Sequence, residues 1–295
     1  MPNITVGILT RDRKEMALRA IASCYTQGIK DLEVVVVVVN SQDGTYEAVR
    51  EKFPQVKLIR IPRNLGCPGG RNHVYANSSG DYIVNLDDDG YLGKGALKRV
   101  VEVFKSDPGI GIIALRQCYP GEPIPDRNDK KSLIEVGHFL GGVSAFRMRM
   151  LDEIGYYPED FFFFKEEEFL DLKVIDAGYK IIFDPAIIMW HPRTQETVSI
   201  DTRRDYYRYR NPLLVVIRLF PGRYLWQYLI ARIISYGLVS LRRKSVRQYF
   251  QAVAAALMTL PTALSKRHPC RPETVRKYLS LREEGQIKEL FYGQD

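Results

Sequence analysis

One stretch of the sequence leads from a short apolar strand into three consecutive carboxylates and a glycine: Asp81-Tyr82-Ile83-Val84-Asn85-Leu86-Asp87-Asp88-Asp89-Gly90. Because side chains alternate along an extended chain, Asp87 and Asp89 share one face and Asp88 takes the other. Two carboxylates on one face repel each other unless a cation lies between them, and a hard divalent ion meets that need. A solvated acidic turn or a helix N-cap also accounts for aspartates here. The stretch therefore predicts a strand end and leaves metal binding open.

The segments before this strand predict a mostly parallel α/β sheet. Three apolar segments precede it, at residues 4–9, 32–39 and 56–61, and a helical segment follows each, at residues 14–27, about 45–53 and 71–78. This alternation is typical of a parallel sheet flanked by helices. Leu32 to Val39 is apolar on both faces, as expected of a central strand. Ligands of such sheets bind beyond the carboxyl ends of the strands, where loops and helix N-termini meet.

Two common phosphate-binding motifs are absent after the first strand. Neither a GxGxxG fingerprint nor a GxxxxGK[ST] loop follows the first strand. Asp43 could instead accept the imide N–H of a pyrimidine, and Arg71 and Asn72 stand at a helix start that suits phosphate or base contacts. The nearby glycines, Gly66 and Gly69-Gly70, fit a ligand-binding loop and an ordinary turn equally well.

The composition is that of a globular protein with an uneven charge distribution. Of 295 residues, 45% are hydrophobic and 26% are charged. Residues 1–200 hold 25 Lys and Arg against 28 Asp and Glu (net −3), whereas residues 201–295 hold 18 against 7 (net +11). The four cysteines show no CxxC spacing and no secretory leader precedes them, which predicts free thiols, a cytoplasmic location and no structural zinc.

The basic C-terminal part predicts a helical extension. Two amphipathic segments, Arg223 to Leu241 and Val246 to Leu264, flank Arg242-Arg243-Lys244. Arg232 interrupts the first and Pro261 the second, so neither is expected to span a membrane. A basic helical hairpin with tryptophan and tyrosine suits an anionic membrane surface, where a lipid-linked acceptor would be found, and would place the protein on the inner face of the membrane. Packing on the rest of the chain or in a homodimer is the alternative.

Several of these segments together resemble family 2 glycosyltransferases of the GT-A fold. The resemblance rests on the loop Asn40 to Thr45, on the segment from Asn64-Leu65-Gly66 to Arg71-Asn72, and on Gly80-Asp81-Tyr82 leading into Leu86-Asp87-Asp88-Asp89. It implies a GT-A catalytic domain over residues 1–212 and a basic amphipathic helical extension over residues 213–295. The basic, aromatic segment Arg203 to Pro212 resembles a Tyr-Tyr-x-x-Arg-Asn segment that lies near the diphosphate in the family, although such a composition could also stack on nucleic-acid bases.

The resemblance implies a metal site and a donor site. The family's Asp-x-Asp motif binds a divalent ion, Mn or Mg, that holds the sugar-nucleotide diphosphate, so Asp87 and Asp89 would be ligands and Asp88 would face the sugar or ribose. His191 would join the metal or the diphosphate, although a lone histidine is more often structural. The expected contacts with a UDP-, dTDP- or GDP-linked donor are Thr10, Arg11, Asp43, Asn64, Gly66, Arg71, Asn72, Asp87 and Asp88.

Three glutamates, Glu166-Glu167-Glu168, stand shortly after four consecutive phenylalanines. One carboxylate in such a cluster should have a raised pKa from like charges and desolvation, which suits a general base. Acids at a helix N-terminus are also favoured by the macrodipole alone. In the family an aromatic run precedes a Glu-Asp pair whose second member is the catalytic base, which implies Glu167 first, then Glu166 and Glu168, with glutamate in place of the usual aspartate. Gly141 and Gly142 match the family's segment beside the acceptor.

The resemblance implies an inverting, metal-dependent glycosyltransferase. It would move a sugar from a nucleoside-diphosphate sugar to an acceptor hydroxyl in polysaccharide, glycolipid or other glycoconjugate biosynthesis, with no nucleic acid as a partner. A nucleotidyltransferase acting on sugar phosphates also uses paired aspartates, but Thr10-Arg11-Asp12-Arg13 does not supply its glycine-rich loop. A non-catalytic sugar-nucleotide-binding protein would not need the cluster Glu166 to Glu168.

Overall fold

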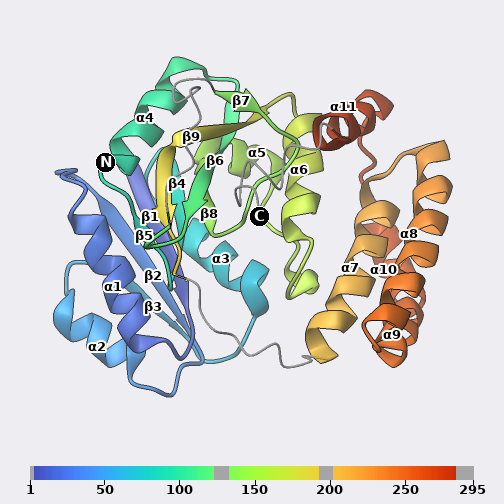
Figure 1. Ribbon diagram of the computed structural model, residues 1–295, viewed down its shortest axis with the longest axis horizontal. Helices are drawn as coiled ribbons and strands as arrows, with labels where there is room; N and C mark the ends of the chain where they lie inside the picture. The colour runs from blue at the N-terminus through green and yellow to red at the C-terminus, as the bar shows by residue number, and fades with distance from the viewer. Residues whose placement is uncertain (1–2, 123–132, 193–201, 284–295) are drawn as a thin grey trace.

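The computed structural model describes residues 3–122, 133–192 and 202–283. The polar segment Tyr119 to Lys131, which its composition predicts to be a surface loop, lies mostly outside the described residues. Its centre is a nine-stranded sheet of order β3-β2-β1-β4-β8-β6-β9-β5, with β7 paired to β9 (Figure 1). The strands are β1 Ile4–Thr10, β2 Glu33–Val39, β3 Lys57–Ile61, β4 Tyr82–Asp87, β5 Tyr91–Leu92, β6 Ile110–Cys118, β7 Ile134–Glu135, β8 Val143–Arg147 and β9 Lys180–Trp190. Strands β1, β2, β3, β4, β6 and β9 run in one direction and β5, β7 and β8 against them, which confirms the mostly parallel sheet.

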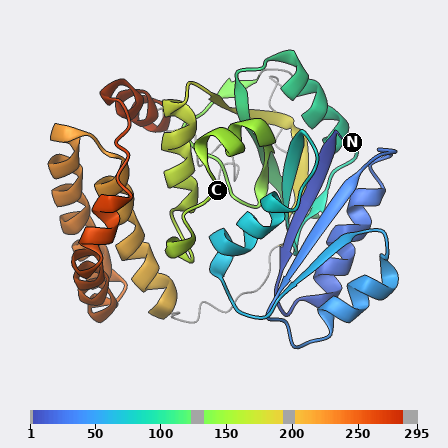
Figure 2. The same ribbon diagram turned by 180° about the vertical axis from the view of Figure 1, so that it is seen from behind.

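Two hydrophobic cores cover the two faces of this sheet. The valine run of β2 alternates between them, with Val34, Val36 and Val38 in one core and Val35, Val37 and Val39 in the other. Helices α1 (Lys14–Tyr25), α2 (Thr45–Lys52) and α4 (Ala96–Ser106) cover one face, and α3 (Gly66–Ala76), α5 (Met148–Ile154) and α6 (Glu166–Asp176) cover the other (Figures 1 and 2). A wholly apolar strand needs cover on both sides, and β2 is the central strand that its sequence predicts.

Helix α3 begins at Gly66, five residues before the predicted start at Arg71. Gly66, Gly69 and Gly70, which the sequence also allows in a loop turn, lie within the first helical turns of α3. A Cβ at Gly70 would lie 2.5 Å from Leu9 Cδ1, and one at Gly69 would lie 2.8 Å from Leu65 Cβ. The glycines therefore allow the helix to approach its neighbours closely, a use that a local pattern does not distinguish from turn formation.

Helices α7 (Thr202–Leu219), α8 (Gly222–Arg242), α9 (Val246–Met258), α10 (Leu260–Ser265) and α11 (Pro272–Glu283) form a further layer beside α6 (Figure 1). Residues 213–217 and Leu219 of α7, and Phe220 just after it, belong to the same core as α6, so the extension packs on the sheet unit. The expected boundary after residue 212 falls inside α7, and the two-domain division stays a prediction. None of the helices in the described part of the chain is long and apolar enough to cross a bilayer.

Candidate active site

A cavity of about 320 Å³ opens at the carboxyl edge of the sheet. The ends of β1 and β4, the first turns of α3 and an aromatic loop (residues 161–165, following the short 3-10 helix Glu159–Phe161) form its walls. Phe162 and Phe163 of the aromatic loop, with Leu9 and Val39, supply apolar parts of the lining. Seven of the nine expected donor contacts line it: Thr10, Arg11, Asn64, Gly66, Arg71, Asp87 and Asp88.

The other two expected donor contacts, Asp43 and Asn72, bind backbone groups beside the cavity. The Asp43 carboxylate accepts hydrogen bonds from the N–H groups of Lys14 (2.9 Å) and Thr45 (3.0 Å), at the starts of α1 and α2. The Asn72 amide donates to the carbonyl oxygen of Tyr157 at 2.9 Å and accepts from its N–H at 3.1 Å. Both side chains thus fix the backbone around the site, and their direct contacts with a donor stay predictions.

Asp87, Asp89 and His191 come together as a cluster that fits a metal ion. One ligand atom from each residue lies within 4.8 Å of the others. The pairing of β5 with β9, in which Tyr91 lies opposite Trp190, brings the end of β9 to the turn that follows β4. Two carboxylates and one imidazole are donors that Mn²⁺ accepts, and carboxylates suit Mg²⁺ as well. Asp88 is outside this cluster, as the alternation of side chains predicts.

Two arginines neutralise the aspartates. Arg71, itself buried, places its Nη2 2.6 Å from Asp87 Oδ1. Arg13 places Nη1 3.0 Å from Asp88 Oδ1 and 2.8 Å from Asp89 Oδ2. Arg71 therefore compensates Asp87 while Asp88 and Asp89 share Arg13, which offsets the repulsion among the three carboxylates.

The pKa values of Asp88 and Asp89 shift in opposite directions. Burial raises the pKa of Asp88, and the charge and hydrogen bond of Arg13 oppose the rise only in part. Burial also acts to raise the pKa of Asp89, but the hydrogen bond and charge of His191, 3.0 Å away, together with Arg13 bring it below the usual range. The Asp89 carboxylate is thus favoured in its charged form, as a metal ligand requires.

The expected acceptor-side glycines lie between the aspartates and the candidate base. A Cβ at Gly142 would be 1.8 Å from Asp87 Oδ2, and a Cβ at Gly141 would be 2.7 Å from Glu167 Oε1. Neither position can take a side chain without moving these carboxylates. Asp87 and Glu167, far apart in sequence, therefore flank one short backbone segment.

The three glutamates at the start of α6 have three different environments. Glu166 is buried, its Oε2 has no hydrogen-bond partner among the described residues, and burial followed by the charge of Glu167 raises its pKa well above the usual range. Glu168 is buried against Arg232 of α8 and Lys165 (3.0 Å); burial opposes ionisation, but these cations lower its pKa well below the usual range. Glu167 is partly exposed beside the acceptor-side glycines. The ion pair with Arg232 thus ties Glu168 to α8 of the helical layer. A base role for Glu167 or Glu166 stays a prediction.

Asn211 of α7 holds the aromatic loop in shape. Phe162, Phe164 and Lys165 have positive φ angles of 61°, 68° and 70°, which non-glycine residues rarely adopt. The side-chain nitrogen of Asn211 lies 2.7–2.9 Å from three carbonyl oxygens of the loop, those of Phe161, Phe163 and Phe164. Because Phe162 and Phe163 line the cavity, the helical layer helps to shape the site.

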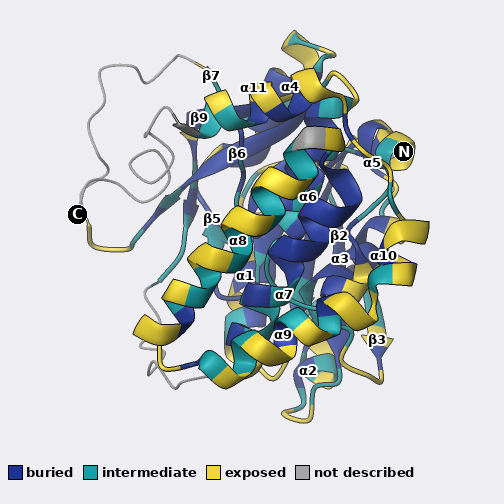
Figure 3. Ribbon diagram, turned by 90° about the vertical axis from the view of Figure 1, so that its right-hand side faces the viewer, coloured by how far each residue is buried: buried dark blue, intermediate teal, exposed yellow. Residues whose placement is uncertain are grey.

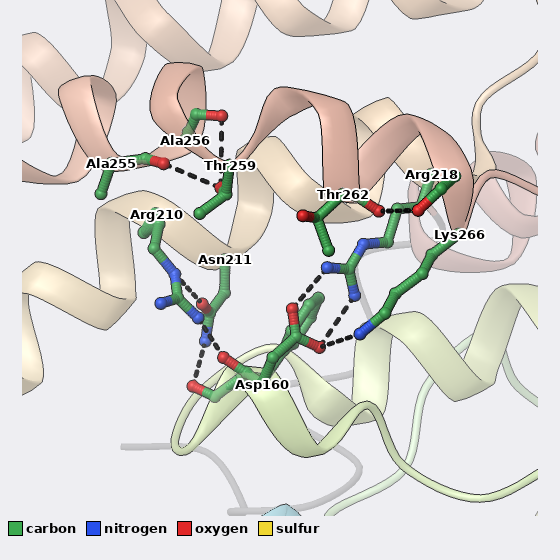
Figure 4. A network of polar contacts seen from close by, with 11 residues as sticks. Asp160, Arg210, Asn211, Arg218, Ala255, Ala256, Thr259, Thr262 and Lys266 are labelled. Atoms are coloured by element: carbon green, nitrogen blue, oxygen red, sulfur yellow. Dashed lines mark hydrogen bonds and ion pairs between the residues drawn. The ribbon is translucent and has the colours of Figure 1, made fainter.

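A second set of contacts fixes the start of the same loop. Figure 4 shows the Asp160 carboxylate facing Arg218 of α7 and Lys266, with Arg210 reaching the Asp160 carbonyl. Arg218 Nη1 lies 3.0 Å from Asp160 Oδ1. Burial acts to raise the pKa of Asp160, but the hydrogen bonds and charge of Arg218 lower it. The loop is therefore fixed at both ends by α7.

Gly66 makes room for the aromatic loop. It has φ +73°, and a Cβ there would lie 2.1 Å from the carbonyl oxygen of Phe162. The next residue, Cys67, donates its N–H to that oxygen at 2.9 Å. The start of α3 and the loop therefore close the cavity from two sides.

Three residues of this site were not predicted from the sequence: Arg13, Asn211 and Arg232. Arg13 stands just before α1, in a loop considered only for its lack of glycines. Asn211 lies in the segment expected near the diphosphate, a place that stays a prediction, and its side chain binds the aromatic loop. Arg232 was noted only as an interruption, although a single charged residue in an apolar helix is a signal for a buried acidic partner.

Part of this chain is similar in sequence to parts of two known proteins. The chain is 32% identical over 106 residues to a GalNAc(5)-diNAcBac-PP-undecaprenol beta-1,3-glucosyltransferase of Campylobacter jejuni, covering 35% of this chain and 34% of the relative. It is 34% identical over 99 residues to a beta-monoglucosyldiacylglycerol synthase of Synechocystis, covering 31% of this chain and 20% of the relative. The matched part thus spans about a third or less of these relatives.

A solved structure has the same fold. The mannosyltransferase PcManGT of Pyrobaculum calidifontis, in complex with GDP-Man and Mn²⁺, superposes with a TM-score of 0.60 at 19% identity, over 99% of this chain and 88% of that chain. The expected GT-A fold is thereby confirmed. The model of glycosyl transferase family 2 matches residues 5–168, which is 164 of 295 residues. This chain therefore belongs to glycosyl transferase family 2, a family of sugar-transferring enzymes.

Proposed function

We propose that the protein is an inverting, metal-dependent glycosyltransferase that moves a sugar from a nucleoside-diphosphate sugar to an acceptor hydroxyl. One observation carries the proposal: the cluster Asp87, Asp89 and His191 meets the cavity at Asp87, and Asp87 and Glu167 lie against the neighbouring glycines Gly142 and Gly141. A site for a charged leaving group and a candidate proton acceptor thus flank one short backbone segment.

The donor diphosphate would bind between Arg71 and the aspartates. Arg71 is buried, Nη2 holds Asp87, and Nε and Nη1 have no hydrogen-bond partner among the described residues. A buried guanidinium with spare N–H donors suits phosphate oxygens. Mn²⁺ or Mg²⁺, held by Asp87, Asp89 and His191, would supply charge neutralisation for the leaving diphosphate. The Mn²⁺ and GDP-Man bound by PcManGT support this assignment.

Glu167 would act as the general base. Its carboxylate takes the proton of the acceptor hydroxyl, whose oxygen forms a bond to the anomeric carbon while the bond from that carbon to the diphosphate oxygen breaks. A single displacement inverts the anomeric configuration. Glu166 is a weaker choice because its raised pKa favours the protonated form, which cannot accept a proton.

The acceptor would be a lipid-linked hydroxyl in glycoconjugate biosynthesis, at the inner face of a membrane. The names of the two relatives specify an undecaprenol-linked substrate and a glucosyldiacylglycerol. The donor would carry UDP, dTDP or GDP, and a homodimer stays a prediction.

A panel of UDP-, dTDP- and GDP-sugars tests the proposal. The full chain with Mn²⁺ should release nucleoside diphosphate from one of them, slowly by hydrolysis and faster with a hydroxyl acceptor, and a chelator should stop the release. NMR of the product should give the inverted anomer. Pyrophosphate release from a nucleoside triphosphate and a sugar phosphate would indicate a nucleotidyltransferase. Binding of a nucleotide sugar without turnover would indicate a non-catalytic binder. A product with the retained anomeric configuration would contradict inversion.

A further inference from the structure

Helix α8 carries a continuous apolar stripe on its outer face. Its members are spaced four, four, four and three residues apart and so lie on one side of the helix: Trp226, Ile230, Ile234, Leu238 and Leu241. Each of them is 55–65% exposed. Figure 3 shows α8 on the outer side of the molecule, with exposed residues recurring along its length. Scattered exposed apolar residues are ordinary, but a contiguous row marks a contact surface.

The remainder of this outer face is uncharged. Between residues 226 and 241 the other exposed positions are Gln227, Ala231 and Ser235. The one charged residue of that span, Arg232, points inward to Glu168. Helix α8 therefore has an inner side that binds the catalytic domain and an outer side free of charge.

Helix α9 extends the apolar surface. It follows α8 directly, and Tyr249 Oη donates a hydrogen bond to the Ile233 carbonyl oxygen at 2.9 Å. Phe250, Leu257 and Met258 are 65–83% exposed. The outer sides of both helices face the viewer in Figure 3. We call the exposed apolar residues of α8 and α9 together the docking surface.

The part of the chain that carries the docking surface is strongly basic. Residues 206–272 contain no Asp or Glu and twelve basic residues: Arg208, Arg210, Arg218, Arg223, Arg232, Arg242, Arg243, Lys244, Arg247, Lys266, Arg267 and Arg271. Four of these, Arg242, Arg243, Lys244 and Arg247, are exposed where the stripe of α8 ends. The surface therefore combines apolar side chains with a local excess of positive charge, which calls for an anionic partner.

We propose that the docking surface binds an anionic lipid membrane. An anionic lipid membrane matches both the apolar side chains and the positive charge of the surface. Apolar side chains enter the boundary between headgroups and acyl chains, and Lys and Arg bind lipid phosphates. A second copy of the chain would bring two basic, acid-free surfaces together. A nucleic acid would neutralise the charge but leave the apolar stripe in water.

This inference builds on the lipid-linked acceptor of the proposed function, and it connects the membrane to the site. Arg232 joins α8 to Glu168, which is adjacent to Glu167 at the start of α6. The helix that contacts lipid on its outer side thus holds Glu168, the neighbour of the candidate base, on its inner side. Binding to lipid needs neither donor nor acceptor, so it can be tested separately from sugar transfer.

Co-sedimentation with vesicles tests the docking surface in the full chain. The wild type should sediment with vesicles that contain phosphatidylglycerol, not with pure phosphatidylcholine, and less at high salt. The variant I230S/I234S removes apolar area and R242E/K244E reverses the charge; each should weaken binding by about tenfold or more, as expected when one of two membrane signals is lost. The control K30E/K52E makes the same charge change at exposed lysines of the N-terminal part and should bind like the wild type.

Circular dichroism melts should show that all variants fold, since every substituted residue is exposed. Equal binding by K30E/K52E and R242E/K244E would attribute the effect to net charge alone and overturn the proposal. Absence of wild-type binding to both vesicle types would also overturn it, as would a dimer in light scattering that I230S/I234S converts to a monomer. Failure of sugar transfer with intact vesicle binding would instead reject only the proposed function.

Discussion

Two runs of three consecutive acids, Asp87 to Asp89 and Glu166 to Glu168, have similar sequences and different structures. The aspartates end a strand and the turn after it, and all three contact cations at one edge of the sheet: Arg71, Arg13 and His191. The glutamates begin a helix, and each faces a different part of the molecule. One is buried without a cation pair, one is beside the acceptor-side glycines, and one is ion-paired to α8.

Backbone geometry explains this difference. A strand turns its side chains by about 180° per residue, so a strand end keeps neighbouring acids near one edge. A helix turns them by about 100° per residue, so three neighbours cover most of its circumference. The comparison shows that a run of like residues can be one site or three independent positions, depending on the element that carries it. The following variants test whether the aspartates act together and the glutamates separately.

The largest effect is expected for Asp89→Asn. The change removes a metal ligand and the partner of His191, so Mn²⁺-dependent affinity for the nucleotide should fall by about a hundredfold or more, given that losing a residue that only supports a metal ligand costs ~10–100-fold. Isothermal titration calorimetry with and without Mn²⁺ measures it. Asp88→Asn, outside the cluster, should weaken metal-dependent binding less. Unchanged affinity in Asp89→Asn would refute the metal site.

Glu167→Gln should lower kcat by about 10²–10⁴-fold with little change in donor affinity, because it removes a proton acceptor and leaves the metal cluster intact. Steady-state kinetics with the best donor separate the two quantities. Glu166→Gln is the matched control and should lose less activity. If Glu166→Gln is the more damaged of the two, the base is Glu166 and the assignment is wrong.

The third effect is on stability. Glu168→Gln leaves Arg232 without its buried partner and should lower the free energy of unfolding by about 3–5 kcal/mol. Urea denaturation measures this loss, and the double variant E168Q/R232M should recover part of it. Glu47→Gln, which breaks an exposed pair with Arg60, should have little effect. Equal losses of unfolding free energy in Glu168→Gln and Glu47→Gln would contradict a larger contribution from the buried Glu168–Arg232 pair.

The smallest effect is on the pH dependence of stability. The pKa of Glu166 is raised in the folded protein, so its contribution is complete below the unfolded pKa of about 4.3 and is lost as pH rises through the folded pKa. The pKa of Glu168 is lowered, so its contribution is present above the unfolded pKa and is lost as pH falls through the folded pKa. Thermal melts across neutral and alkaline pH should show a weaker decline for Glu166→Gln than for the wild type. An identical decline would contradict a buried, neutral Glu166.

Patterns between close neighbours in the sequence predicted much of the fold and part of the site. The valines of β2 alternate between two cores, and Asp87 and Asp89 share a cluster from which Asp88 is absent. Such features depend on backbone periodicity, which a few residues are enough to establish. The start of α3 was misplaced because Gly69 and Gly70 serve close packing, and a glycine has the same appearance in a turn and at a helix contact.

By itself, the sequence determined the parallel sheet, the strand-end aspartates, the family resemblance and the basic, acid-free character of residues 206–272. Only the tertiary structure decided that Glu168 pairs with Arg232, that Asn211 holds the aromatic loop and that Arg13 joins the aspartates. These partners are 47 to 76 residues apart in the chain. The contacts between these partners depend on how the helices pack against the sheet. The repeat of apolar residues within a helix defines the buried face of that helix, but it does not define which residue of another element this face will contact.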